Sequence, residues 1–335
     1  MEEKQGGRTV LVTGAAGWLA QRVVQRLSSR GGIKIISTYN RTAPPPPLPR
    51  VTNLPMDILD ETVCKHVFAS HRPDVVLHLA ALTNTSKCQA DAVEAARVNA
   101  PCGLFNAIRA TCPGTRLVFC STDLCYNGVH PPFLGTHPDA LSLPLNIYAQ
   151  SKLAGERDAL ACVPDCLVLR LSNMIGPGGG KFLDFLRASM ASGAVTGLRA
   201  DERRSFVWVE EVCTLLCQIA ALQDDAGISG VYNVGGPEGL TRLQLGLLLA
   251  ECAGRKVRLD EGTGTCTGTG GVKQEADAGD SPWIIAPQTA ETHPPLFPSP
   301  LDVTMDSDAT CAAFGIRFSS MKTALTTILE LERDA

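Results

Sequence analysis

The start of the chain places a strand, a glycine turn and a helix in direct succession. Residues 8–13 are mostly apolar, and residues 17–29 carry apolar side chains at helical spacing. The turn at 14–17 holds only small residues, so a pyrophosphate can approach its backbone and the free N–H groups of the helix start. Ala20 replaces the usual third glycine, where a methyl group fits. This pattern predicts a dinucleotide-binding turn, with these contacts: Gly14, Gly17, Trp18 and Leu19.

Strands and helices alternate through the first half of the chain. Near-continuous apolar runs at 33–38, 51–55, 74–79, 116–121 and 166–171 predict strands, and helical patterns at 61–71, 91–111 and 146–161 lie between them. Such strands are typical of a parallel sheet with both faces covered, which binds ligands beyond the carboxyl ends of its strands. The predicted fold class is α/β: a Rossmann-type doubly wound parallel sheet with a smaller C-terminal substrate-binding α/β subdomain.

The alternation loosens after about residue 172. We expect a dinucleotide-binding domain over residues 1–170 and a substrate-binding region over 171–335, interleaved with the first through a strand near 230–234. The segment Gly262–Pro300 is rich in Gly, Thr and Pro and is predicted to be a loop or insertion. The stretch Ser320–Glu332 again predicts a helix.

Composition excludes several classes of protein. The net charge is −4 with scattered basic residues, which argues against nucleic acid and anionic membranes as partners. No apolar run reaches the roughly 20 residues that span a bilayer, and the polar start is not a signal peptide. The 13 cysteines show no spacing of a zinc or redox motif. We therefore expect reduced thiols, no metal and a cytoplasmic location.

The residues after the second to fourth strands bear on which dinucleotide binds. An acidic residue at the end of the second strand would accept a hydrogen bond from the 2′-OH of NAD, but the chain has Asn40 and Arg41 there. Arg41 favours the 2′-phosphate of NADP, although a solvated arginine before a loop, and hence NAD, remains the alternative. Asp57–Ile58 are expected to face the adenine, and Ala80–Ala81 to let the cofactor pass close by.

The helix predicted at 146–161 carries Tyr148 and Lys152 near its start. These residues are four positions apart and therefore share one face of the helix. A tyrosine pKa of about 10 is too high for easy proton exchange, and a neighbouring ammonium is expected to lower it. The tyrosine then serves as general acid and base. Ser121 and Thr122, at the end of a strand, can hydrogen-bond a substrate carbonyl beside it. An ordinary surface Tyr–Lys pair is the alternative.

These motifs, taken together, resemble one known family. The chain is similar to the extended short-chain dehydrogenase/reductases, and within them to the dTDP-4-dehydrorhamnose reductase branch. The resemblance covers nearly the whole chain through VTGAAGWLA, HLAA, STDLCYNG, PLNIYAQSKLAGE, LRLSNMIGPG, RSFVWVEEV, VYNVGGPEGLTR and LDVTMDSDATCAAFGI.

The resemblance implies roles for individual residues. Thr122, Tyr148 and Lys152 match the catalytic triad, and the lysine also holds the nicotinamide ribose. Asn99 matches an asparagine near the active site that helps to support the lysine. The implied substrate contacts are Thr83, Asp123 and Arg204. Arg204 matches an arginine that contacts the diphosphate of sugar nucleotides; a solvated or salt-bridged arginine is an equal alternative.

The implied function is reduction of a nucleotide-linked 4-keto-6-deoxy sugar by NADPH, with the proton from Tyr148, in a protein that is compatible with a homodimer. The same branch contains the regulatory β subunit of methionine adenosyltransferase, which binds NADP and serves as a partner of another enzyme. This role is the alternative. An epimerase or dehydratase is a third reading, and a dehydratase is disfavoured because Thr122-Asp123 supplies a single acid.

The chain departs from the branch at three positions. Leu124 replaces a tyrosine, Asn127 an acid, and Ser299 stands where an arginine is frequent. These changes bear on the substrate more than on hydride chemistry.

Overall fold

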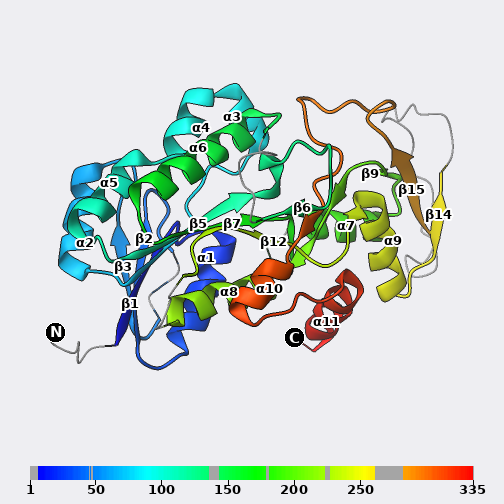
Figure 1. Ribbon diagram of the computed structural model, residues 1–335. Coiled ribbons are helices and arrows are strands. Elements are labelled where there is room, and N and C mark those ends of the chain that lie inside the picture. Colours follow the sequence, from blue (N-terminus) through cyan, green and yellow to red (C-terminus); the bar gives the residue numbers. More distant parts are fainter. Residues whose placement is uncertain are drawn as a thin grey trace.

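The computed structural model describes residues 7–44, 46, 48–135, 143–178, 181–222, 227–260 and 282–334. A parallel sheet of seven strands forms its centre, in the order β12-β7-β5-β4-β1-β2-β3 (Figure 1). These strands are β1 (Arg8–Thr13), β2 (Ile33–Tyr39), β3 (Val51–Pro55), β4 (Val75–His78), β5 (Arg116–Thr122), β7 (Cys166–Leu171) and β12 (Gly230–Val234). The order reverses between β1 and β4, where a doubly wound sheet opens its ligand crevice. The predicted fold class is confirmed.

Helices cover both faces of this sheet because its strands are apolar on both sides. Val10 and Val12 of β1 pack in one core with α1 (Trp18–Ser28), α8 (Val209–Ala221) and α10 (Asp308–Phe314). Leu11, which points the other way, packs with α2 (Glu61–His71), α5 (Cys102–Thr111) and α6 (Ile147–Cys162). In Figure 1 the second set lies above the sheet and the first set below it.

The helix predicted over residues 91–111 is two helices, which corrects that expectation. α4 (Ala92–Asn99) ends before Pro101, and α5 begins after it. Proline restricts the residue before it to extended conformations, so the helix stops there. A further short helix, α3 (Thr85–Ala90), precedes α4.

The second half of the chain forms a smaller α/β layer beside the main sheet. Its three-stranded sheet has the order β14-β15-β9, with a core that includes Leu245, Trp283 and Leu325. The elements are α7 (Lys181–Ser192), β9 (Thr196–Arg199), α9 (Arg242–Cys252), β14 (Val257–Leu259), β15 (Trp283–Gln288) and α11 (Met321–Arg333). Short pieces between the layers are η1 (Asp123–Cys125), β6 (Phe133–Leu134), β8 (Met174–Ile175), β10 (Arg203–Arg204), β11 (Val207–Trp208), β13 (Leu240–Thr241) and β16 (Met305–Asp306).

The segment Gly262–Pro300 is not a loop throughout, which corrects a second expectation. Within this segment, residues 262–281 lie outside the described part of the chain, but residues 283–288 form β15, the central strand of the smaller sheet. Trp283 and Ile285 are fully buried there. In the second half of the chain, β12 pairs in parallel with β7 at the edge of the main sheet.

Two further expectations concern the surroundings of the protein. Among the described helices, none is both long and apolar enough to cross a bilayer. Every cysteine in the described part of the chain is a free thiol, and that part contains no group of side chains suited to hold a metal ion.

Candidate active site

The glycine turn brings two strand ends into contact. Gly14 has a φ of 72°, and a Cβ atom there would lie 2.8 Å from the Cα atom of Ala80. The hydroxyl of Thr13 accepts hydrogen bonds from the N–H groups of Leu79 and Ala80, both at 3.1 Å, and lies 2.9 Å from Nδ1 of His78. The ends of β1 and β4 are therefore locked together, and only glycine fits at position 14.

A cleft of about 570 Å³ opens at the carboxyl ends of β1, β4, β5 and β7. It brings together many of the residues that the sequence predicts for cofactor, substrate and catalysis: Gly17, Trp18, Leu19, Ala81, Thr83, Thr122, Tyr148 and Lys152. Gly17 caps the start of α1, so the free N–H groups of that helix face the cleft. Asn173 and Met174, which were not predicted from the sequence, also line the cleft.

Tyr148 lies in the first turn of α6, where the Asn146 side chain caps the helix by accepting the N–H of Ala149 at 3.0 Å. Burial raises the pKa of Tyr148 above its usual value, and the Cys125 and Asp123 side chains act in the same direction. A hydrogen bond with the Thr122 side chain opposes the rise. The shift is opposite to the predicted lowering, because burial disfavours the charged phenolate more than this hydrogen bond favours it.

Lys152 is buried with 1 % of its surface exposed, and its Nζ lies 4.1 Å from the centre of the Phe119 ring. Burial lowers its pKa to about 8, while the Cys120, Cys125 and Glu156 side chains act in the opposite direction. The lysine is therefore still largely charged at neutral pH. The face of the Phe119 ring partly stabilises this charge.

Asn99 supports the catalytic helix rather than the cofactor. Its carboxamide accepts the N–H of Leu82 at 2.8 Å, and it donates to the carbonyl of Leu82 at 3.1 Å and to the Ser151 hydroxyl at 2.9 Å. Gly155 allows this approach, because a Cβ atom there would lie 2.2 Å from the carbonyl oxygen of Asn99. Asn99 thus ties α6 to the segment that follows β4, and it does not line the cleft.

The residues predicted to lie at the adenine end of the cofactor follow β2 and β3. Asn40 and Arg41 are exposed just beyond β2. Asp57 uses its carboxylate to accept the N–H of Leu59 at 3.0 Å, and Ile58 is 8 % exposed in the core under α2. Asp57 therefore shapes a turn, and the side chain of Ile58 packs in the core; their contact with the adenine stays a prediction.

Asp123 is buried beside Thr122 and Tyr148. It accepts hydrogen bonds from the hydroxyls of Thr122 at 3.2 Å and Ser172 at 3.0 Å. Burial raises its pKa, whereas the nearby charge of Arg204 and these hydrogen bonds lower it. The hydroxyls of Thr122 and Ser172 already donate to the carboxylate of Asp123, so Asp123 affects Tyr148 mainly through its charge.

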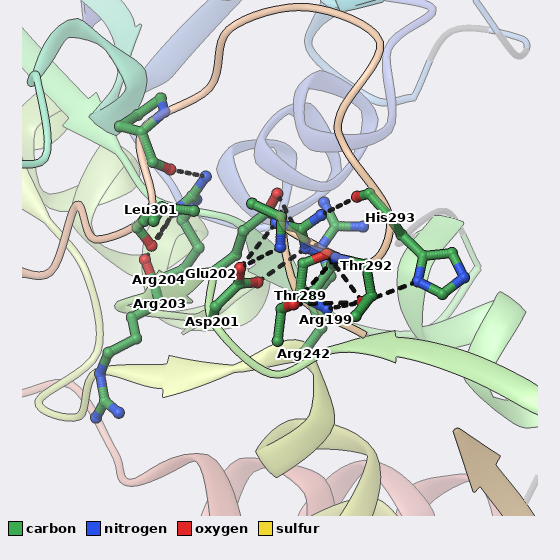
Figure 2. Close-up of polar contacts among 12 residues, drawn as sticks. Arg199, Asp201, Glu202, Arg203, Arg204, Arg242, Thr289, Thr292, His293 and Leu301 are labelled. Carbon is green, nitrogen blue, oxygen red and sulfur yellow. Dashed lines mark hydrogen bonds and ion pairs between the residues drawn. The ribbon is translucent and has the colours of Figure 1, made fainter. Parts of the chain in front are cut away.

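Arg204 is buried, and its guanidinium binds the main chain (Figure 2). It donates to the carbonyl oxygens of Arg203 at 2.8 Å, Pro300 at 3.1 Å and Leu301 at 3.4 Å. It lines neither the 570 Å³ cleft nor the second cavity described next. The interpretation as a structural arginine is therefore the one that the contacts favour.

A second cavity, of about 440 Å³, lies in the smaller layer and was not predicted. Arg199, Arg242 and Phe182 line it, and the Arg242 guanidinium lies 5.0 Å from the centre of the Phe182 ring. Glu202 joins the two arginines, at 3.6 Å from each, as Figure 2 shows. The charged run RADERR at 199–204 is the sequence signal that could have pointed here.

Arg204 connects the two cavities electrostatically. Its charge lowers the pKa of Asp123, which lies beside Tyr148. Burial lowers the pKa of Arg242, Glu202 opposes this, and the charges of Arg204 and Arg199 lower it further. The charge of Arg204 therefore acts on groups beside both cavities, while Glu202 pairs with Arg242 and Arg199, and Asp201 pairs with Arg199.

Comparisons of sequence and structure identify relatives of this chain. A family described as the RmlD substrate binding domain matches residues 8–333. The Bacillus subtilis spore coat polysaccharide biosynthesis protein SpsK is 30% identical over 178 residues, which are 52% of this chain and 56% of that protein. The Danio rerio methionine adenosyltransferase 2 subunit beta is 28% identical over 251 residues, 73% of each chain.

Among solved structures, that of dTDP-4-dehydrorhamnose reductase from Bacillus anthracis in complex with NADP has a TM-score of 0.76. The alignment covers 97% of this chain and 99% of that one, at 17% identity, so the likeness is one of fold. The family match confirms the predicted branch.

Proposed function

Because this chain belongs to the RmlD substrate binding domain family, we propose that it is an NADP-dependent reductase of a nucleotide-linked 4-keto-6-deoxy sugar. The proposal depends on three features of the chain: a turn that fits a dinucleotide, a buried tyrosine that holds its proton, and a second cavity lined by Arg199 and Arg242.

The glycine turn fits the phosphates of NADP. A Cβ atom at Gly14 would clash with the backbone of Ala80, and the N-terminus of α1 presents its N–H groups to the cleft. Gly14, Gly17, Trp18 and Leu19 would hold the pyrophosphate, Lys152 the nicotinamide ribose and Arg41 the 2′-phosphate. The reduced nicotinamide supplies hydride to a carbonyl carbon when it is bound.

Tyr148 is suited to donate a proton to the carbonyl oxygen. Its raised pKa keeps the phenol protonated at neutral pH. The Thr122 side chain, which is hydrogen-bonded to Tyr148, orients the carbonyl between the two hydroxyls. Proton transfer from a positioned group contributes about 10²–10⁴-fold to a rate. The charge of Lys152 in the same cleft favours the phenolate that remains.

The arginines at the second cavity are the observation that carries the substrate class. With a keto sugar at Tyr148, a diphosphate would reach towards Arg242 and Arg199, which line the second cavity, while Arg204 would act only through its charge. The flat base of a nucleotide can then pack in the cavity beside Phe182. A small keto acid or a steroid would use neither these arginines nor the second cavity.

The decisive experiment follows NADPH absorbance with a dTDP-4-keto-6-deoxyhexose present and NADH as the control cofactor. We expect consumption that requires the sugar nucleotide, and its loss in Tyr148→Phe with NADPH binding unchanged. Tyr232→Phe, which changes a tyrosine that does not line the cleft, is the matched control. Full turnover in Tyr148→Phe would exclude the proposed mechanism.

A second candidate is a regulatory subunit that binds NADP without consuming it. The similarity to methionine adenosyltransferase 2 subunit beta favours it, as does Leu124, which lines the cleft where the branch has a tyrosine hydroxyl. This candidate predicts tight NADPH binding, no consumption with several nucleotide 4-keto sugars, and co-purification with the methionine adenosyltransferase catalytic subunit in a pull-down.

A further inference from the structure

A buried ion pair lies behind the candidate catalytic residues. Nη2 of Arg170, on β7, is 2.6 Å from Oε2 of Glu156, and its Nε is 3.0 and 3.2 Å from the two carboxylate oxygens. The side chains are 0 % and 2 % exposed. Glu156 follows Lys152 by one helical turn on α6, so both lie on the same face of the helix. Removing two charges from water is costly, so such a pair needs further partners.

The partners of the pair come from the strand and turn that carry Thr122. The hydroxyl of Ser121 donates to Oε1 of Glu156, and the Cys125 thiol lies 3.4 Å from the same oxygen. The guanidinium of Arg170 lies 4.7 Å from the centre of the Tyr126 ring. The pair therefore joins α6, β5, β7 and η1, the elements that carry or flank Thr122, Tyr148 and Lys152.

The network continues beyond the cleft to the strands β6 and β16. The Tyr126 hydroxyl donates to Oδ1 of Asn233 at 2.7 Å. Nδ2 of Asn233 donates to the carbonyl oxygens of Phe133 at 2.7 Å and Asp306 at 3.2 Å, one in β6 and one in β16. An unbroken series of buried contacts thus leads from the catalytic helix to the strand pair β6–β16.

We propose that Glu156 and Arg170 are positioning residues, which fix the Tyr148–Lys152 face of α6 against Thr122 and tie it to the strand pair β6–β16. Neither residue lines the cleft, so the pair acts through its neighbours. The catalytic consequence rests on the proposed function, whereas the effect on the charge of Lys152 does not.

The environment of Lys152 shows what the pair contributes. Burial lowers the pKa of the lysine to about 8, and the thiols of Cys120 and Cys125 and the carboxylate of Glu156 oppose this. Burial raises the pKa of both thiols, that of Cys120 to about 12, so they are neutral at pH 7. His78, whose pKa is lowered to about 3, is also neutral. Glu156, which is paired with Arg170, is the one carboxyl side chain among these groups.

The test uses two readouts on the full chain. The pKa of Lys152 is measured by NMR titration of ¹³C-lysine-labelled protein, with the signal assigned through Lys152→Met. NADPH-dependent reduction gives kcat and KM. In Glu156→Gln, we expect the pKa of Lys152 to fall by about one unit. We also expect kcat to fall by about 10- to 100-fold, with a smaller change in KM, because misplacement of reacting groups slows chemistry more than binding.

A second variant covers the case in which Glu156→Gln does not fold. Glu156→Gln combined with Arg170→Met removes both charges and leaves no unpaired one, which proteins often tolerate. The double variant is expected to show the same fall in kcat and a smaller fall in the pKa of Lys152, because the positive charge of Arg170 is lost together with the negative charge of Glu156. Glu61→Gln, which breaks an exposed ion pair with Lys65 on α2, is the control and is expected to change neither.

The outcomes separate the two proposals. A folded double variant with an unchanged pKa of Lys152 and unchanged kcat would overturn the positioning role. If the wild-type chain reduces no sugar nucleotide, the proposed function fails, and the NMR titration alone decides whether the pair sets the charge of Lys152. A fall in KM and kcat with an unchanged pKa in Glu156→Gln would also count against the proposal, since a carboxylate one turn from Lys152 has to act on its proton.

Discussion

Nε1 of Trp18 donates a hydrogen bond to the carbonyl oxygen of Pro177 at 3.1 Å, across one end of the cleft. Trp18 begins the helix that follows the glycine turn, whereas Pro177 follows β8 on the opposite wall. Arg22 reinforces the bridge, because its guanidinium binds the same carbonyl at 2.5 Å and lies 5.2 Å from the centre of the Trp18 ring. The two walls of the cleft are therefore fixed relative to each other where a pyrophosphate would enter.

Trp18→Phe is expected to weaken NADPH binding by about 3- to 10-fold, since it removes one hydrogen bond of about 0.5–1.5 kcal/mol while keeping an aromatic ring. Isothermal titration calorimetry with NADPH measures the change. Trp208→Phe, which alters a tryptophan that does not line the cleft, is the control and leaves the affinity unchanged. Equal affinity in Trp18→Phe and the wild-type chain would show that the bridge plays no part in cofactor binding.

Gly14→Ala is expected to abolish NADPH binding and to destabilise the fold. The new Cβ atom would lie 2.8 Å from the Cα atom of Ala80, in a residue with a φ of 72°. Gly32→Ala separates backbone strain from the steric clash. Gly32 has a φ of 75°, but no atom lies within 4 Å of the Cβ atom that alanine would add there. Left-handed strain alone costs about 1–2 kcal/mol. We expect urea unfolding to show that cost for Gly32→Ala without any loss of NADPH affinity.

Much of the main sheet could be predicted because each strand is buried on both faces and is therefore a short apolar run. The strand at 166–171, the helix at 61–71 and the strand at 230–234 have the predicted bounds. The smaller layer could not be predicted in the same way. β15 has the sequence WIIAPQ, apolar up to its last residue, and follows a segment that begins rich in Gly and Thr; its burial depends on β9 and β14, which are far away in the sequence.

The candidate site shows the same limit at the level of single side chains. Thr122, Tyr148 and Lys152 share a cleft, as their positions at a strand end and a helix start predict. The direction of the Tyr148 pKa shift could not be predicted, because it depends on burial and on Cys125 and Asp123. Nor could the partners of Arg204 be predicted, since its carbonyl acceptors Pro300 and Leu301 are close to it only in the folded chain.

Arg242→Gln tests the second cavity as the place of the nucleotide. The substitution removes a positive charge that lies over Phe182 and in the field of Arg204, and the proposed diphosphate would lose an attractive partner. We expect KM for the sugar nucleotide to rise by about tenfold, in line with a charged hydrogen bond of about 1.5–3 kcal/mol, with kcat unchanged. Arg187→Gln, in an ion pair with Glu332 away from this cavity, is the control. A fall in kcat at constant KM would place Arg242 in the chemistry instead.

The lowered pKa of Lys152 makes the free energy of unfolding depend on pH, and Lys152→Met removes this dependence. Burial lowers its pKa from 10.5 to about 8, so the unfolded chain binds this proton more tightly than the folded chain does. The cost to folding is fully present below pH 8 and disappears as the pH rises towards 10.5. We expect Lys152→Met to raise the free energy of unfolding by about 3 kcal/mol at neutral pH, and this gain to shrink towards zero near the upper limit of that window. Urea unfolding of both proteins across the window measures the difference, with the exposed Lys65→Met as a variant whose effect stays constant. A gain for Lys152→Met that does not change with pH would mean that the lysine is not titrating inside the fold.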